Sequence, residues 1–140
     1  MTDIRVFIVG MGLTTPLARG VARNWAALKK GKTGIGKLTL FPTAEDLSFP
    51  VGEVKEALSP TGPPRTHQLA LMAAEEAMAH GEGSPDAIVM GSTTGGMSRT
   101  EKLLKREPLD PSLFSYHSAG SVAEYVALKL KCKGPIITVS

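Results

Sequence analysis

The chain has 140 residues, enough for one domain with a single hydrophobic core. Hydrophobic residues make up 42% and charged residues 21% of it, which excludes a disordered chain, and no apolar run is long enough to span a membrane. The net charge of +3 comes without an aromatic-rich basic groove. We therefore predict no nucleic-acid or membrane partner and, because the N-terminus lacks a signal-peptide pattern, a cytoplasmic location.

The N-terminal region predicts a strand, a glycine turn and a helix. Residues 4–9 (Ile-Arg-Val-Phe-Ile-Val) form an apolar run typical of a strand buried on both faces. A turn at residues 10–16 leads to a helix that should end near Lys30-Gly31. Residues 33–50 have no helical period and should be irregular, with a short edge strand at 51–54. The expected core face of the helix consists of Ala18, Val21, Ala22, Trp25 and Leu28.

The middle of the chain predicts a second helix and a second strand. Turn residues at 59–64 precede a helix that Thr66 can cap and that should finish near His80-Gly81. Residues 87–90 predict a short buried strand, and residues 100–106 a short exposed helix. The core face of the first of these helices should comprise Leu69, Met72, Ala73 and Ala77.

The strand at 87–90 is followed by small and hydroxyl-bearing residues. Open α/β sheets place their ligand contacts at this end of a strand. The junction, Gly91-Ser-Thr-Thr-Gly-Gly96, is therefore the most function-like stretch of the chain.

The C-terminal region predicts a helix, a Gly-Pro turn and a buried strand. Lys131, Lys133 and Gly134 are typical of a helix end, and the β-branched residues at 136–139 favour a strand. A buried strand at this position suggests a cut inside a larger protein. One helix face should consist of Ala119, Val122, Ala123, Val126 and Leu130, with Tyr125 and Leu128 as a second apolar strip.

No complete catalytic, metal or cofactor site is predicted. The Gly10-x-Gly12 pair lacks the third glycine of a dinucleotide-binding fingerprint, and Met97 stands where a Walker loop needs lysine. The three histidines are not spaced for a metal, and His117 should be a capping or surface residue. Cys132, the single cysteine, should be a small apolar filler.

Several motifs together resemble the start of β-ketoacyl-[acyl-carrier-protein] synthases of the elongating type. They are residues 7–17 (Phe-Ile-Val-Gly-Met-Gly-Leu-Thr-Thr-Pro-Leu), 24–28, 31–35, 51–54, Arg65 with its Ala-rich helix, 90–96 and 134–140. The resemblance covers essentially the whole chain. It implies a thiolase-like layered α/β/α fold, of which residues 1–140 are the N-terminal half: a mixed sheet with helices on its faces, truncated before the nucleophilic cysteine.

The resemblance also implies a chemistry. In the family, the strand like residues 135–139 leads into a Thr-Ala-Cys turn whose cysteine takes an acyl chain from acyl carrier protein. Two histidines of the C-terminal half then assist decarboxylative condensation with malonyl-carrier protein. Neither Cys132 nor the histidines here match those residues, so the fragment should be inactive alone. The parent would serve fatty acid or polyketide synthesis; the alternatives are a non-catalytic partner of the chain-length-factor type and a nucleotide-binding domain.

The family motifs suggest site residues. Ser92, Thr93, Thr94 and Gly95 match a loop that borders the acyl pocket, although a tight turn would need the same residue types. Leu113 and Phe114 match a segment that reaches toward a partner subunit. The edge formed by Ile136, Ile137, Thr138 and Val139 is where the resemblance places a homodimer or synthase heterodimer. Glu124 stands where the family has a small residue, which predicts looser packing of the last helix.

Overall fold

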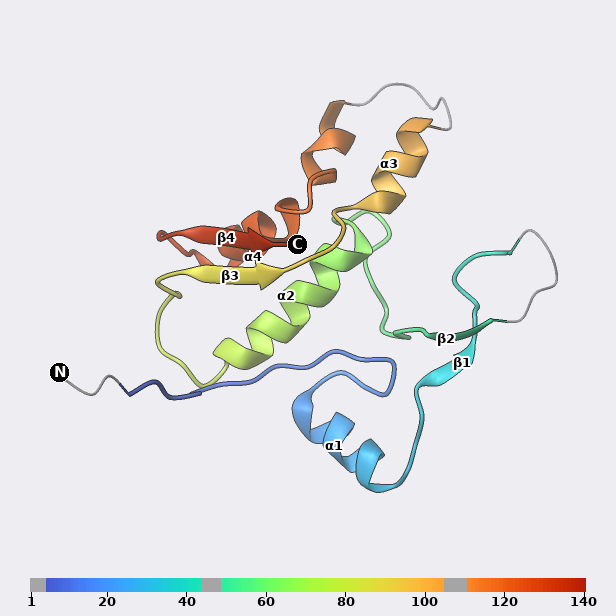
Figure 1. The fold of residues 1–140 in the computed structure, drawn as a ribbon, viewed down its shortest axis with the longest axis horizontal. Coiled ribbons are helices and arrows are strands. Elements are labelled where there is room, and N and C mark those ends of the chain that lie inside the picture. The colour runs from blue at the N-terminus through green and yellow to red at the C-terminus, as the bar shows by residue number, and fades with distance from the viewer. Residues whose placement is uncertain (1–4, 44–48, 105–110) are drawn as a thin grey trace.

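The computed structural model describes residues 5–43, 49–104 and 111–140, and these form a mixed α/β fold (Figure 1). Figure 1 shows α2 between the β3–β4 pair and the N-terminal segment. Within the described residues every helix is too short or too polar to cross a membrane. In chain order the elements are α1 (Val21–Lys29), β1 (Ile35–Lys37), β2 (Pro50–Gly52), α2 (Arg65–Met78), β3 (Ile88–Gly91), α3 (Met97–Leu104), the 3-10 helix η1 (Pro111–Tyr116), α4 (Ser121–Leu130) and β4 (Ile136–Val139).

The strands form two small sheets. β3 and β4 are parallel, with Ile88 opposite Ile136 and Gly91 opposite Val139. Parallel neighbours need a crossover, and α3, η1 and α4 lie in the connection between them. β1 and β2 pair antiparallel, so the prediction of irregular chain at 33–50 is wrong for residues 35–37 and 50. The edge strand expected at 51–54 is present at 50–52 instead.

The core lies between α2, α4 and β3. Its buried centre consists of Ile88, Ala123, Val126 and Ala127. From α2 the side chains of Ala70, Leu71 and Ala74 pack against this centre, so the core face of α2 is rotated from the one predicted. Cys132 also packs against it, which confirms its role as a filler.

The face predicted for α4 is confirmed, and of the second apolar strip only Tyr125 is partly buried, against His67. Leu128 is 74% exposed because no described element covers that side of the helix. Glu124 is exposed as well, and Ala123 beside it is completely buried, so looser packing of α4 is not observed. The helix ends at Lys131, which adopts a left-handed conformation with φ of 58°, before Gly134 is reached.

The predicted N-terminal strand is not formed. The side chains of Val6, Phe7, Ile8 and Val9 are 72–89% exposed. No described strand pairs with this segment. A buried strand needs partners for its backbone N–H and C=O groups, and an apolar run alone does not supply them. The segment instead follows α2, where a Cβ on Gly10 or Gly12 would overlap a carbonyl oxygen of that helix. The Gly-x-Gly pair thus serves close packing of backbone on backbone.

Helix α1 is held by polar contacts, and its predicted apolar face is largely exposed. Trp25 and Leu28 face solvent, whereas Asn24 is buried and donates to the carbonyls of Ala18 and Gly20, each at 2.8 Å. No residue of the predicted face is buried. The start of α1 is instead hydrogen-bonded to the side chain of Glu76 on α2.

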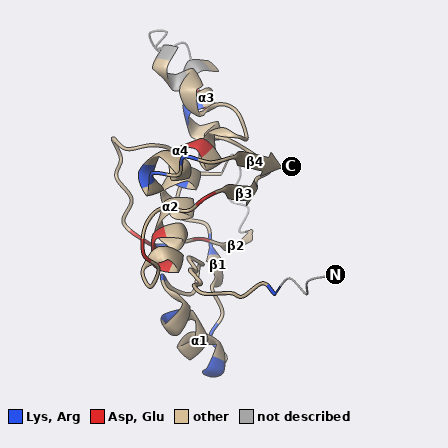
Figure 2. Ribbon diagram, turned by 90° about the vertical axis from the view of Figure 1, so that its left-hand side faces the viewer, with Lys and Arg blue, Asp and Glu red and all other residues tan. Residues whose placement is uncertain are grey.

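That carboxylate belongs to Glu76. It accepts the backbone N–H of Leu13 at 2.8 Å and that of Val21, the first residue of α1, at 2.7 Å. These hydrogen bonds lower the pKa of Glu76. A negative charge at a helix N-terminus also suits the helix dipole. Figure 2 shows acidic residues on α2 and basic ones on α1 and α4.

Two further helix ends differ from prediction. α2 begins at Arg65 after Pro64, and Thr66 lies inside the helix without capping it. α3 begins at Met97, three residues before the predicted start. Pro64 precedes α2, and the closely packed Gly95 and Gly96 precede α3. A search of the sequence for capping residues does not detect these starts.

Candidate functional site

The candidate site is the loop at residues 92–96, between β3 and α3. The backbone N–H of Ser92 donates to the carbonyl of Val139 at 3.0 Å, which continues the β3–β4 ladder by one step. The loop therefore begins beside the C-terminal end of β4. The hydroxyl of Ser92 donates to the Thr94 carbonyl at 2.9 Å, so it shapes the turn from within.

The glycines of the loop are required by packing. Both Gly95 and Gly96 are buried, Gly95 against the segment that joins η1 to α4 and Gly96 against Pro64 and the end of η1. A Cβ on Gly95 would overlap the carbonyl oxygens of His117 and Ser118, and one on Gly96 would press on Pro64 and Tyr116. The structure thus supports a backbone reason for Gly95, whereas Thr93 and Thr94 have exposed side chains. A role of the loop in an acyl pocket stays a prediction.

Behind this loop lies a buried histidine that the sequence analysis did not single out. His67 on α2 is completely buried, and its Nε2 lies 3.0 Å from Oγ of Ser121 on α4. The Ser121 hydroxyl proton is directed to the carbonyls of Ser118 and Tyr116, at 2.6 and 3.1 Å. Since that proton is committed, Oγ accepts and His67 Nε2 carries the hydrogen.

His67 is also fixed at its second nitrogen and at its ring. Oγ1 of Thr66 lies 3.2 Å from Nδ1 and 3.4 Å from the Gly95 carbonyl, which connects the histidine to the loop. Tyr116 and Tyr125 meet the imidazole edge-on, with ring centroids 5.0 and 5.7 Å away. Burial lowers the pKa of His67, so the neutral ring is favoured. The signal available in the sequence was the position of His67 at helical spacing from Ala70, Leu71 and Ala74.

The other histidines lie at the surface. His117 is exposed and its Nδ1 lies 3.0 Å from Oγ1 of Thr100, which connects the end of η1 to α3. Its predicted surface position is confirmed, but it caps no helix. His80 is exposed just beyond α2. In the ranges that the structure describes, no three His, Cys, Asp or Glu side chains are grouped to hold a metal ion.

The predicted dimer edge is more exposed than expected. Ile136, Ile137 and Val139 are 43–58% exposed and Thr138 is half-buried. The prediction of a buried strand is therefore wrong for burial, although the strand itself is present. The reason is that β4 has β3 as its only neighbour among the described strands. Phe114 in η1 is also exposed, and the side chain of Leu113 lies outside the described part of the structure.

A family model for the N-terminal domain of β-ketoacyl synthases matches residues 3–140. The chain belongs to this family. The ketoacyl synthase alpha subunit of the tetracenomycin polyketide synthase from Streptomyces glaucescens is 29% identical over an alignment of 163 positions, gaps included, that covers 97% of this chain and 38% of the relative. The chain thus spans well under half of that β-ketoacyl synthase.

Solved ketosynthase structures have the same fold. The ishigamide ketosynthase/chain length factor superposes with a TM-score of 0.79 at 22% identity, over 95% of this chain and 39% of the other. A β-ketoacyl synthase from Burkholderia phymatum STM815 superposes with a TM-score of 0.71 at 21% identity, over 93% and 38%. The predicted thiolase-like α/β fold, in its N-terminal part, is confirmed.

Proposed function

We propose that residues 1–140 form the N-terminal domain of a β-ketoacyl-acyl-carrier-protein synthase. Its parent condenses an acyl thioester with malonyl-carrier protein by decarboxylative Claisen chemistry, in fatty acid or polyketide synthesis. The nucleophilic cysteine and the two assisting histidines belong, in this proposal, to sequence that follows residue 140. Membership of the family over residues 3–140 supports it.

One observation carries the proposal: the register of β3 and β4. Gly91 lies opposite Val139, and the Ser92 N–H binds the Val139 carbonyl. A nucleophile placed just after β4 would therefore emerge beside the loop at 92–96. Thr93 and Thr94, whose side chains are exposed, are the residues of this loop that would border an acyl chain. Ser92 and Gly95 would hold the loop in shape.

Of the proposed partners, the carrier protein follows from membership of the family, and the second subunit also from the exposed edge of β4. Acyl carrier protein would deliver the acyl chain in the cytoplasm. A second synthase subunit, identical or related, would pair with the edge at Ile136–Val139, since an uncovered apolar strand edge favours addition of another strand. Leu113 and Phe114 would extend this interface. Half-exposed Ile137 and Val139 support the pairing.

A non-catalytic synthase-like partner is the second candidate. The structural match to a ketosynthase/chain length factor favours keeping it. In the described fold both candidates would use β3, β4 and the loop between them, so they differ only in whether a nucleophile follows β4.

The reading frame that continues from the Ser140 codon separates the two. A Thr-Ala-Cys turn directly after β4 supports the condensing enzyme, and another residue at the cysteine position supports the non-catalytic partner. In a biochemical test, the 140-residue chain is incubated with carrier protein that carries an acyl thioester, and intact mass spectrometry measures whether the chain gains the mass of the acyl group. We expect no acyl transfer to Cys132, which packs against the core. Stoichiometric acylation of Cys132 would overturn the assignment of the nucleophile to later sequence.

A further inference from the structure

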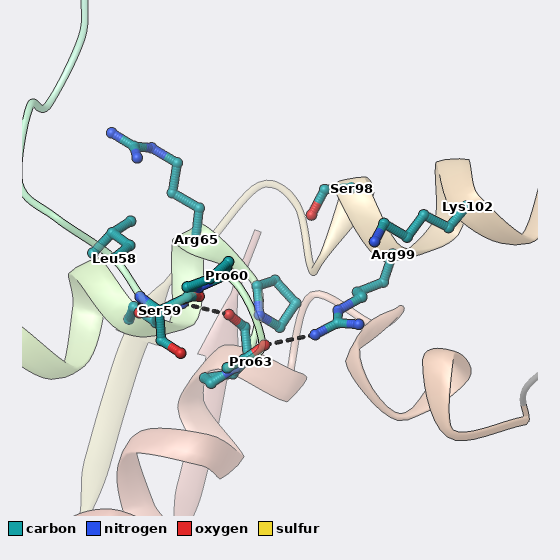
Figure 3. Close-up of a pocket in the computed structure, with 11 residues that line it drawn as sticks. Leu58, Ser59, Pro60, Pro63, Arg65, Ser98, Arg99 and Lys102 are labelled. Atoms are coloured by element: carbon teal, nitrogen blue, oxygen red, sulfur yellow. Dashed lines mark hydrogen bonds between the residues drawn. The ribbon is translucent and has the colours of Figure 1, made fainter. Parts of the chain in front are cut away.

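A cavity of about 220 Å³ lies between the start of α2 and the outer face of α3 (Figure 3). One wall is the proline-rich turn at residues 59–64. The side chain of Gln68 holds this wall in place: its Oε1 accepts the Ser59 N–H at 2.9 Å, and its Nε2 donates to the carbonyls of Ser59 and Pro63 at 3.0 and 2.7 Å. The cavity thus has a fixed backbone wall on the side opposite α3.

Two cationic side chains from α3 enter this cavity. Arg99 and Lys102 lie three residues apart on the helix, and Figure 3 shows both extending toward the proline turn. Nη2 of Arg99 donates to the Gly62 carbonyl at 2.6 Å, which holds the guanidinium at the rim with further N–H groups available. Arg65 also lines the cavity, but its guanidinium turns away and donates to the Val54 carbonyl.

The positive charges of the cavity are not balanced by a carboxylate in its lining. None of the 11 residues that line it is acidic. Like charges three residues apart on a helix repel each other, so an anion between Arg99 and Lys102 would relieve that cost. The Ser98 hydroxyl lies on the same wall as a further donor.

The ends of two helices add to the positive potential. α2 begins at Arg65 and α3 at Met97, and residues from the first turn of each line the cavity. In α2 the first amide with a backbone acceptor in the described structure is that of His67, so the two before it contribute unpaired N–H dipoles.

We propose that this cavity binds an oxyanion of the phosphate class, held by Arg99 and Lys102 against the proline turn. The volume is several times the roughly 30 Å³ that one water molecule occupies in the liquid, which leaves room for a phosphate group with some hydration. The phosphate group can be free or esterified on a larger molecule. The inference does not depend on the proposed condensation chemistry.

Inorganic phosphate titrated into the ¹⁵N-labelled protein tests the site, with chloride at equal ionic strength as the reference. We expect saturable shifts at the amides of Ser98, Arg99 and Lys102 with phosphate and none with chloride. Lys102→Gln should weaken binding about threefold, the effect of one exposed charge contact. Lys133→Gln removes the same charge from an exposed position elsewhere and should leave the affinity unchanged.

Arg99 also holds the turn through its hydrogen bond to the Gly62 carbonyl, so its removal could unfold the wall of the cavity. The variant Arg99→Lys is therefore measured too: it keeps the positive charge and loses the planar guanidinium that can bind phosphate with two N–H groups. Weaker phosphate binding in Arg99→Lys with an unchanged melting temperature supports the site. Equal losses in Lys102→Gln and Lys133→Gln, or chloride shifts as large as those with phosphate, would overturn it. Glycerol phosphate identifies the source: binding as tight as inorganic phosphate indicates an esterified group, and weaker binding indicates the free ion.

Discussion

Replacing His67 by glutamine should change how the stability of the protein depends on pH. The ring is completely buried and donates from Nε2 to Ser121, and burial lowers its pKa below the ordinary value of 6.5. As pH falls through 6.5 the unfolded chain takes up a proton at this histidine and the folded protein does not. The free energy of unfolding therefore decreases as the pH falls, by at most about 1.4 kcal/mol per pH unit.

The assay is urea unfolding of wild type, His67→Gln and His117→Gln between pH 7.5 and 5.0. At pH 7.5, His67→Gln should lower the free energy of unfolding by about 1–2 kcal/mol, because an amide can still donate to Ser121 but the ring contacts are lost. Between pH 6.5 and 5.0 its slope should be shallower than that of wild type. His117→Gln replaces an exposed histidine and controls for loss of an imidazole. Equal slopes in wild type and His67→Gln would refute the assignment of the linked proton to His67.

Three further tests, each by chemical denaturation, address core packing, loop packing and the N-terminal contact. Val126→Ala should lower the free energy of unfolding by about 2 kcal/mol, since the side chain is buried, whereas Leu128→Ala on the exposed side of α4 should cost less than about 0.5 kcal/mol. Gly95→Ala should cost about 2 kcal/mol, because backbone must move, and Gly91→Ala, with open space around it, should be near neutral; equal costs would contradict the packing argument. Glu76→Gln should destabilise the protein at pH 7 and progressively less below pH 4.5, because the lowered pKa of the carboxyl means that its stabilisation is lost on protonation; a constant difference from pH 7 to pH 3 would exclude this.

The positions of the elements near the C-terminus followed from local pattern. The face of α4, the strand β4 and the turn between them depend on residues close in sequence, and each is present as predicted. Burial depends on what lies opposite, which periodicity does not contain. Trp25 and Leu128 repeat at helical spacing and yet face solvent, because no described element covers them.

The buried polar residues were the hardest to foresee. Asn24 and His67 are inside because their hydrogen-bond partners come from the turn before α1 and from α4, respectively. A partner 54 residues away, as Ser121 is from His67, leaves no local signal. The glycines behaved similarly: Gly95 is needed because a distant carbonyl approaches it, and the sequence pattern alone left a ligand turn and a packing turn equally possible.

The loop at 92–96 shows how packing can define a site without supplying its chemistry. Its first residue is bound to the end of β4, and Gly95 is pressed against His117 and Ser118, just before α4. Ser121, the first residue of α4, in turn fixes His67. None of these contacts involves the side chains of Thr93 and Thr94, which are exposed. Under the proposed function, the residue that follows β4 would decide whether this turn lies beside a nucleophile.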